Sequence, residues 1–175
     1  TCCGMDREFE LMPSRNGQTL ADRTAAHVLT QHATTYGRFF HEYRERGSDE
    51  RQYCAPGVDL PVVSIMRGMY RTYPEYHTHK DDLSLISATG LQGSYEVHVR
   101  CLEALERNAT YRVTTIGEPQ LGRRNLYTLD ARQICGYSDG MTDLLEIAER
   151  INRPVWELFG IVEQLEGAGL LRRVA

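Results

Sequence analysis

The sequence predicts an α/β fold followed by a small winged-helix domain, and three patterns carry this prediction. Residues 57–70 contain the apolar run Val62, Val63, Ile65 and Met66, which is typical of a strand buried on both faces of a mostly parallel sheet. Helical patterns lie before and after this strand. Near the C-terminus a helix, a tight turn, a second helix and a strand follow one another, which is the order of a winged helix.

The segments before the central strand have simpler patterns. Residues 1–6 are expected to be the end of a strand, and a polar loop follows them. In residues 19–33, apolar side chains recur at helical spacing after Thr19, which can cap the helix. The aromatic stretch 36–43 predicts a short strand that ends at a glycine turn.

The segments after the central strand predict a long helix and a second domain. The helix covers residues 89–108, and its apolar face is expected to hold Leu91, Tyr95, Val99, Leu102 and Leu105. A strand over 110–116 and a linker rich in Gly, Pro and Arg follow. We therefore divide the chain into an α/β domain, residues 1–118, and a linker with the winged helix, residues 119–175.

Within the second domain, turn and cap signals set the expected helix ends. Thr142 is expected to start a short helix, and Pro154 to start a longer one that ends at Gly167 or Gly169. The longer helix carries three glutamates and no Lys or Arg, so it would repel phosphates: Glu157, Glu163 and Glu166. Nucleic acid is therefore disfavoured as a partner.

The amino-acid composition indicates which class of protein the chain belongs to. Apolar residues make up 41% of the 175 residues and charged residues 25%, which is ordinary for a globular protein. No apolar run approaches the roughly 20 residues that span a bilayer, and the N-terminus lacks a signal-peptide pattern, so we expect a cytoplasmic protein without membrane contact. The five cysteines show no paired spacing, which fits reduced thiols.

Residues 77–81, His-Thr-His-Lys-Asp, resemble the His-Thr-x-x-Asp signature of zinc aminopeptidases of the bacterial leucyl-aminopeptidase type. Residues 47–67 are similar to the serine-aspartate loop and strand that precede this signature. Runs such as PSRNG, YPEYHT, GLQGS and GEPQLG resemble a narrower group, the bacterial aminopeptidase-like proteins that end in a winged helix. This resemblance covers nearly the whole chain. It implies a three-layer α/β/α aminopeptidase-like fold, of which residues 1–118 are the C-terminal half.

The resemblance also implies metal-site residues. His77 matches the terminal zinc ligand, and Asp81 matches the aspartate that supports the ligand's loop. At the N-terminal strand end the narrower group has Asp where this chain has Met5, so Asp6 remains the candidate ligand there. A solvated loop residue is the alternative for Asp6, and a turn cap is the alternative for Asp81.

Further candidates lie around this expected site. Asp49 and Glu50 occupy the loop that faces the active site in the zinc aminopeptidases, and there they would contact a substrate α-ammonium or take part in catalysis. A turn capped by Ser48, with solvated carboxylates, is the alternative. Tyr53 would contact substrate, and Tyr76 would stabilise the tetrahedral oxyanion with its phenol; simple packing is the alternative for both.

A hydrolytic zinc site needs about three protein ligands and a base. The resemblance implies that the other ligands and the Glu base belong to an N-terminal half outside this chain. We therefore expect a heteromer with a polypeptide that carries this half, and the heteromer could itself form a homo-oligomer. One or two zinc ions, or another divalent metal, would lower the pKa of the attacking water and polarise the amide at the amino terminus of a peptide or aminoacyl substrate.

Two other functions stay open. In the first, the winged helix binds a peptide or protein and the α/β domain is an inactive peptidase scaffold. In the second, Thr1 is the nucleophile of a self-cleaved N-terminal-nucleophile hydrolase, because a free α-amine can act as base for an adjacent side chain. Ordinary trimming is the alternative explanation for a chain that begins at Thr1.

Overall fold

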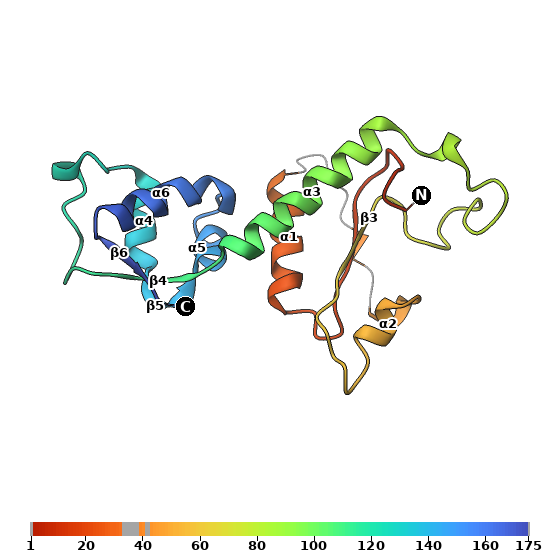
Figure 1. Ribbon diagram of the computed structural model, residues 1–175, viewed down its shortest axis with the longest axis horizontal. Coiled ribbons are helices and arrows are strands. Elements are labelled where there is room, and N and C mark those ends of the chain that lie inside the picture. The colour runs from red at the N-terminus through yellow and green to blue at the C-terminus, as the bar shows by residue number, and fades with distance from the viewer. Residues whose placement is uncertain (1, 33–38, 41–42, 175) are drawn as a thin grey trace. The chain divides into compact units, whose positions relative to one another are not determined.

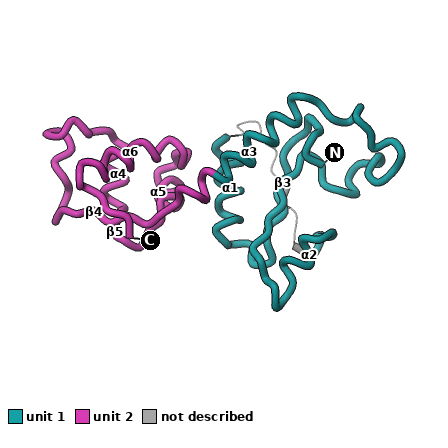
Figure 2. Tube along the Cα trace, in the orientation of Figure 1, with its two compact units in different colours: residues 1–102 teal, residues 103–175 magenta. Residues whose placement is uncertain are grey.

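The computed structural model describes residues 2–32, 39–40 and 43–174 (Figure 1). It divides into two compact units, residues 1–102 and 103–175 (Figure 2). Thr1 lies outside the described residues, so its expected role stays a prediction. The first unit contains β1 (Glu10–Met12), α1 (Leu20–His32), β2 (Phe39–Phe40), η1 (Tyr43–Glu45), α2 (Glu50–Tyr53), β3 (Ser64–Met66), η2 (Leu83–Leu85) and most of α3 (Ala88–Arg107).

The sheet of the first unit has the strand order β2-β1-β3. β2 runs parallel to β1, whereas β3 runs antiparallel to it, with Leu11 opposite Ile65. The described strands therefore form a mixed sheet, and the expected mostly parallel sheet is wrong for them. Ile65 and Met66 are consecutive and both buried, as expected for a strand covered on both faces. The three-layer arrangement stays a prediction.

The N-terminal segment differs from its expectation. Residues 2–7 form turns, and the strand begins only at Glu10. These turns are held against β3 and the residue after it, because the Arg67 amide donates to the Cys2 carbonyl at 2.6 Å and the Cys3 thiol donates to the Ile65 carbonyl at 3.8 Å. The chain thus reaches the end of β3 without pairing with it as a strand.

Helix α1 forms at its expected position and has the expected N-terminal cap. The Thr19 hydroxyl accepts from the Asp22 amide at 3.3 Å, and the Asp22 carboxylate accepts from the Thr19 amide at 2.9 Å. This reciprocal pair is a capping box in which Asp takes the place of Glu. The helix buries Ala25, Val28 and Leu29 from the predicted apolar face, and it also buries Asp22 and His27.

Helix α3 also forms where expected, but a different face is buried. The buried residues in the first unit include Ser94 and Val97, whereas Leu91 and Tyr95 are exposed. The reason is the N-terminal turn: the Ser94 hydroxyl donates to the Cys3 carbonyl at 2.5 Å, and a side chain at Gly90 would collide with the backbone of Gly4. Small residues bring this face of the helix against the turn.

The second unit is a winged helix. It contains the end of α3 and then β4 (Thr110–Val113), η3 (Gly122–Arg124), α4 (Leu129–Tyr137), β5 (Asp139–Asp143), α5 (Leu144–Arg150), α6 (Val155–Gly167) and β6 (Leu171–Arg173). β4 lies in the middle of the sheet and pairs antiparallel with β5 and β6. The boundary between the two units therefore lies before β4, and not after residue 118, because β4 forms its hydrogen bonds with β5 and β6 of the second unit.

The helix ends of the second unit match the sequence in part. α6 ends at Gly167 and follows Pro154, as predicted. Thr142 is buried in β5, and Asp143 caps α5 instead, since its carboxylate accepts from the Glu146 amide at 2.7 Å. Helix α4 and strand β5 were not predicted. The helices pack around a core that includes Ile134, Leu144, Leu145, Ile147, Leu158, Val162 and Leu165.

Replacing Thr128 with Ala is expected to lower the free energy of unfolding of the second unit by about 1 kcal/mol, which is the usual cost of losing an N-cap. The Thr128 hydroxyl accepts from the Ala131 amide at 3.0 Å at the start of α4. Urea unfolding followed by fluorescence of the single tryptophan, Trp156 in α6, measures the change. Thr128→Ser keeps the acceptor and should stay close to wild type, and an equal loss in both variants would contradict this role of the hydroxyl.

None of the helices in the described ranges combines the length and apolar character that crossing a bilayer requires.

Candidate functional site

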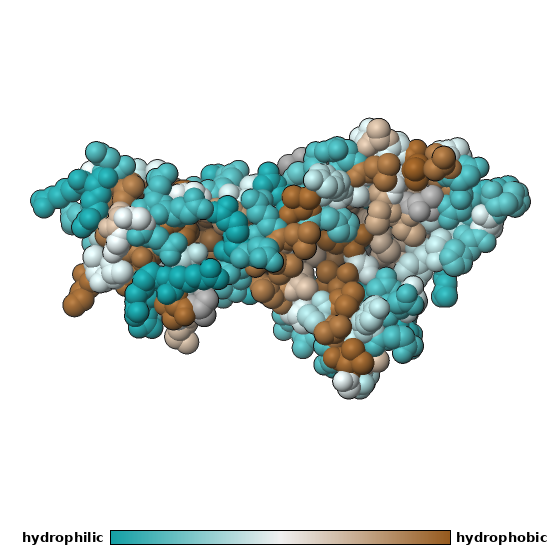
Figure 3. All heavy atoms as spheres, in the orientation of Figure 1, coloured by the Kyte–Doolittle hydropathy of each residue, from teal (hydrophilic) through white to brown (hydrophobic). Residues whose placement is uncertain are grey.

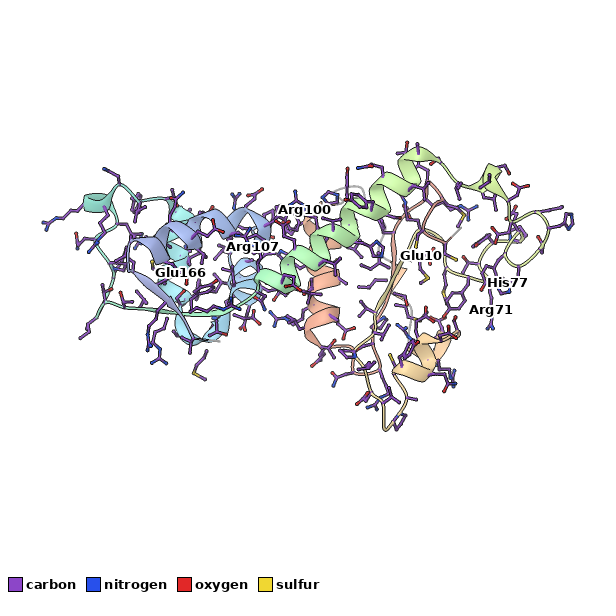
Figure 4. The ribbon with its side chains drawn as sticks, viewed as in Figure 1. Glu10, Arg71, His77, Arg100, Arg107 and Glu166 are labelled. Carbon is purple, nitrogen blue, oxygen red and sulfur yellow. The ribbon has the colours of Figure 1, made fainter. Side chains whose placement is uncertain are left out.

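His77 lies in the long loop that runs from β3 to α3 (Figure 4). Its backbone has φ 58°, a left-handed conformation that residues other than glycine seldom adopt. Backbone hydrogen bonds fold the chain on either side of it, from the Tyr76 amide to the Tyr73 carbonyl at 3.3 Å and from the Thr78 amide to the Glu75 carbonyl at 3.0 Å. The side chain is exposed, so its imidazole can be reached from outside the chain.

Aromatic rings support the imidazole. The Tyr76 ring stacks on the His77 ring, with centroids 4.0 Å apart and planes inclined by 13°. Tyr73 is buried and meets Tyr76 edge-on at 5.7 Å, and Tyr70 lies 6.2 Å from Tyr76. The Tyr70 hydroxyl accepts from the Gly47 amide at 2.7 Å, which ties this cluster to the loop before α2. Tyr76 therefore contacts His77 directly; its expected role toward an oxyanion stays a prediction.

Three carboxylates of the first unit have an oxygen that is buried and has no hydrogen-bond partner among the described residues. They are Oε2 of Glu50, Oε2 of Glu75 and Oδ1 of Asp81. A buried acceptor without a donor costs free energy, so a donor or a cation from outside the described residues would stabilise each of them. Glu50 and Asp81 were expected site residues. Glu75 was not, although it stands two positions before His77.

Asp6 has a different partner from the expected metal. Its Oδ1 accepts from Nη2 of Arg67 at 2.9 Å, and Arg67 also donates to the carbonyls of Arg7 and Gly90. The guanidinium lies over the Phe9 ring at 4.6 Å. In this structure the Asp6 carboxylate thus binds Arg67, and Arg67 connects the N-terminal turn, the end of β3 and α3.

The other expected substrate contacts lie around α2. Asp49 occupies the N-cap position of this short helix without a side-chain cap hydrogen bond, and Ser48 precedes it with φ 56°. Tyr53 ends the helix with 51% of its surface exposed. Contact of Asp49 and Tyr53 with a substrate stays a prediction.

One carboxylate near the His77 loop escaped the sequence analysis. Glu10 lies on β1 between the buried residues Phe9 and Leu11, and its Oε1 accepts from the Met69 amide at 3.2 Å. Figure 4 labels it together with Arg71 and His77. A charged residue between two large apolar residues is the signal in the sequence, but the pattern of the segment after residue 6 predicts a polar loop.

The described residues do not by themselves fit a zinc ion. No group of three His, Cys, Asp or Glu side chains within the described ranges could hold a metal. Within these ranges no third ligand side chain therefore lies with His77 and Asp6, and a zinc site takes about three protein ligands.

The second unit has cavities of its own. The larger has a volume of about 520 Å³ and lies between β4, the loop after it and α4, with Val113, Pro119 and Cys135 in its wall. An ion pair between Arg132 and Glu118, at 2.9 Å, borders it. Burial, and secondarily the charge of Glu118, raises the pKa of the Cys135 thiol, so this thiol stays protonated at neutral pH.

The smaller cavity, about 170 Å³, has Tyr111 and Glu166 among its lining residues. Arg107, another lining residue, lies over the Phe159 ring at 4.1 Å and pairs with Glu163 (Figure 4). Burial, and then the charge of Glu166, raises the pKa of the Tyr111 hydroxyl. This cavity therefore combines carboxylates, two arginines, Arg107 and Arg173, and a neutral phenol.

Comparison with known proteins agrees with the two units. Residues 109–173 match the family model of a winged helix-turn-helix. A Clostridium acetobutylicum protein, provisionally named a polysaccharide biosynthesis protein with an aminopeptidase-like domain, is 31% identical over 161 residues, which cover 85% of this chain and 36% of that protein. A crystal structure of a provisionally named peptidase from Clostridium acetobutylicum has a TM-score of 0.89 and 29% identity, and the match covers 99% of this chain and 40% of that one.

The chain thus spans less than half the length of the relatives that it matches. One of these relatives is named for an aminopeptidase-like domain and the other is named as a peptidase. Residues 1–108 match the model of the family described as a domain of unknown function, DUF4910. That match covers more than half of the chain, which therefore belongs to the DUF4910 family.

Proposed function

We propose that this chain supplies the His77 loop to an aminopeptidase-like hydrolase, and that a polypeptide equivalent to the rest of its relatives completes the site. In this proposal His77 gives one nitrogen ligand to a zinc ion, and the partner gives the remaining ligands and the base. The reaction is hydrolysis of an amide bond at an amino terminus. The observation that carries the proposal is the exposed His77 imidazole, held in a left-handed turn and stacked on Tyr76.

Two further observations support a site that is shared between polypeptides. The chain lacks a complete metal-binding group within its described residues. In addition, Glu50, Glu75 and Asp81 each have a buried oxygen without a partner. Because an incoming polypeptide, cation or substrate ammonium could satisfy such oxygens, we assign Glu50 to a substrate α-ammonium and Asp81 to support of the His77 loop.

The test is the metal content of the chain purified in the assembly in which it occurs naturally. We expect His77→Ala to lose the bound zinc, measured by elemental analysis, and to lose peptidase activity. His79→Ala is the matched control, because this histidine is exposed on the same loop two residues away, and it should keep both. An assembly without metal, or one whose metal and activity do not depend on His77, would rule out the proposal.

A second candidate function is peptide binding by the second unit. The cavity of about 520 Å³ beside β4 and α4 favours it, because a mixed lining of apolar side chains, such as Val113 and Pro119, and of the Arg132–Glu118 ion pair suits a short peptide segment. Peptide binding in an assembly that contains no metal would favour this function.

A further inference from the structure

Helix α3 has a row of apolar side chains that the first unit leaves uncovered. We call Leu91, Tyr95, Val99 and Leu102 the α3 stripe. Their exposed fractions are 51%, 65%, 41% and 62%. Steps of four, four and three residues place them along one face of the helix. Figure 3 shows hydrophobic atoms over part of α3 on the face in view.

The opposite side of α3 already makes the contacts that hold the helix in its unit. Ser94 and Val97 are buried, and the Ser94 hydroxyl donates to the Cys3 carbonyl. A helix packed on one side only usually has a polar outer face. Here the helix has an apolar row on an outer face as well, as expected for an element that lies between two layers of protein.

Polar groups next to the α3 stripe are engaged with each other. Gln92 donates to Oε1 of Glu96 at 2.8 Å, and His32 lies 3.5 Å from Oε2 of the same carboxylate. These contacts hold the Glu96 carboxylate toward Gln92 and His32. Contiguous exposed apolar surface of this kind marks a contact site for another polypeptide.

We propose that the α3 stripe docks the polypeptide that corresponds to the part of the relatives which this chain does not span. The inference rests on the proposed function. The matched relatives extend well beyond the region of similarity, since this chain covers 36% and 40% of them. The occupant is therefore an aminopeptidase-like segment that presents an apolar face to α3.

The position of the stripe along the chain favours this occupant over a second copy of the chain. The His77 loop leads through η2 directly into α3, and Leu83 of η2 is 81% exposed. A polypeptide that covers the stripe thus lies next to the loop that it has to complete. A stable interface buries about 1,200–2,000 Å² in total, so the stripe would be its apolar centre and the loop would form part of its rim.

A photo-crosslinking amino acid at position 95 tests the proposal in cells that contain the natural protein. We expect crosslinked peptides, identified by mass spectrometry, from the aminopeptidase-like segment outside residues 1–175. The matched control carries the crosslinker at Thr89, which is exposed on the same helix outside the stripe and should give few such products. Crosslinks only to a second copy of this chain, or no protein crosslinks, would overturn the proposal.

A second measurement uses substitutions that leave the core intact. Tyr95→Glu and Leu102→Glu should weaken association with the segment found by crosslinking by about tenfold or more, while the circular dichroism spectrum stays unchanged. Unchanged association would overturn the proposal. The two proposals fail with different results. If only the proposed function is wrong, crosslinking at position 95 would still succeed, but the assembly would contain no metal that depends on His77.

Discussion

Replacing Arg67 with Met is expected to lower the free energy of unfolding of the first unit by about 2–3 kcal/mol, because the backbone carbonyls that accept from this buried guanidinium would lose their donor. Arg67 is only 9% exposed, and it donates to the carbonyls of Arg7 and Gly90 and to the carboxylate of Asp6. Methionine keeps the apolar stem over the Phe9 ring but removes all of these donors. The buried Gly90 carbonyl, in the first turn of α3, would lose its side-chain donor.

Hydrogen exchange resolved to peptides of residues 1–102 measures this effect where it arises. Faster exchange should appear in the N-terminal turn, in β3 and at the start of α3, since Arg67 joins these segments. Arg15→Met is the matched control, because Arg15 likewise pairs with an aspartate, through two hydrogen bonds to Asp59, but on the exposed surface. We expect no measurable change there, since exposed ion pairs contribute little. Equal protection in wild type and the Arg67 variant would show that the network does not stabilise the unit.

Replacing Asp22 with Ala is expected to destabilise the first unit by about 3 kcal/mol, because hydrogen-bond donors would lose their acceptor in a buried position. The Asp22 carboxylate accepts from the amide and hydroxyl of Ser14 at 2.7 and 2.6 Å. It also accepts from the amide and hydroxyl of Thr19 at 2.9 and 2.6 Å. The carboxylate thus fixes the loop after β1 to the first turn of α1. Asp82→Ala is the control: its carboxylate accepts from the Ser84 amide at an exposed turn, and its loss should destabilise the unit clearly less than the loss of Asp22 does.

The same contacts predict a dependence of stability on pH. Burial by itself would raise the pKa of Asp22, but the hydrogen bonds from Ser14 and Thr19 outweigh it and lower this pKa below its ordinary value of 3.8. The stabilisation is therefore fully present above pH 3.8 and is lost as the pH falls through the lowered pKa of the folded state. Asp22→Asn removes this titration, so its unfolding free energy should fall less steeply below pH 3.8 than that of wild type. Parallel curves for the two proteins would contradict the assignment.

Local patterns in the sequence were enough for elements with strong signals. Thr19 marks the start of α1, and Pro154 and Gly167 mark the two ends of α6, because caps and helix breakers act within a few residues of themselves. The winged-helix outline was confirmed for the same reason. Helix α4 escaped prediction because it is short and follows directly on the linker rich in Gly, Pro and Arg, and its cap became apparent from the hydrogen bond between the Thr128 hydroxyl and the Ala131 amide.

Contacts between distant residues decided what the patterns left open. The sequence showed an apolar row on α3, but not that small residues at Gly90 and Ser94 would turn another face toward the N-terminal turn. It showed Asp6 as a carboxylate near a strand, but not that Arg67 would bind it. Such pairings join residues far apart in the chain, and no local signal records them.

For the candidate site, the sequence by itself determined which side chain to examine, because the His77 motif is local and so is the turn that surrounds it. Only the tertiary structure decided that Tyr76 stacks on this imidazole and that Glu50, Glu75 and Asp81 keep buried oxygens to which no other described residue donates. The physical reason is that stacking and burial depend on how the loop packs on the rest of its unit, whereas the type of residue and its backbone turn depend on near neighbours alone.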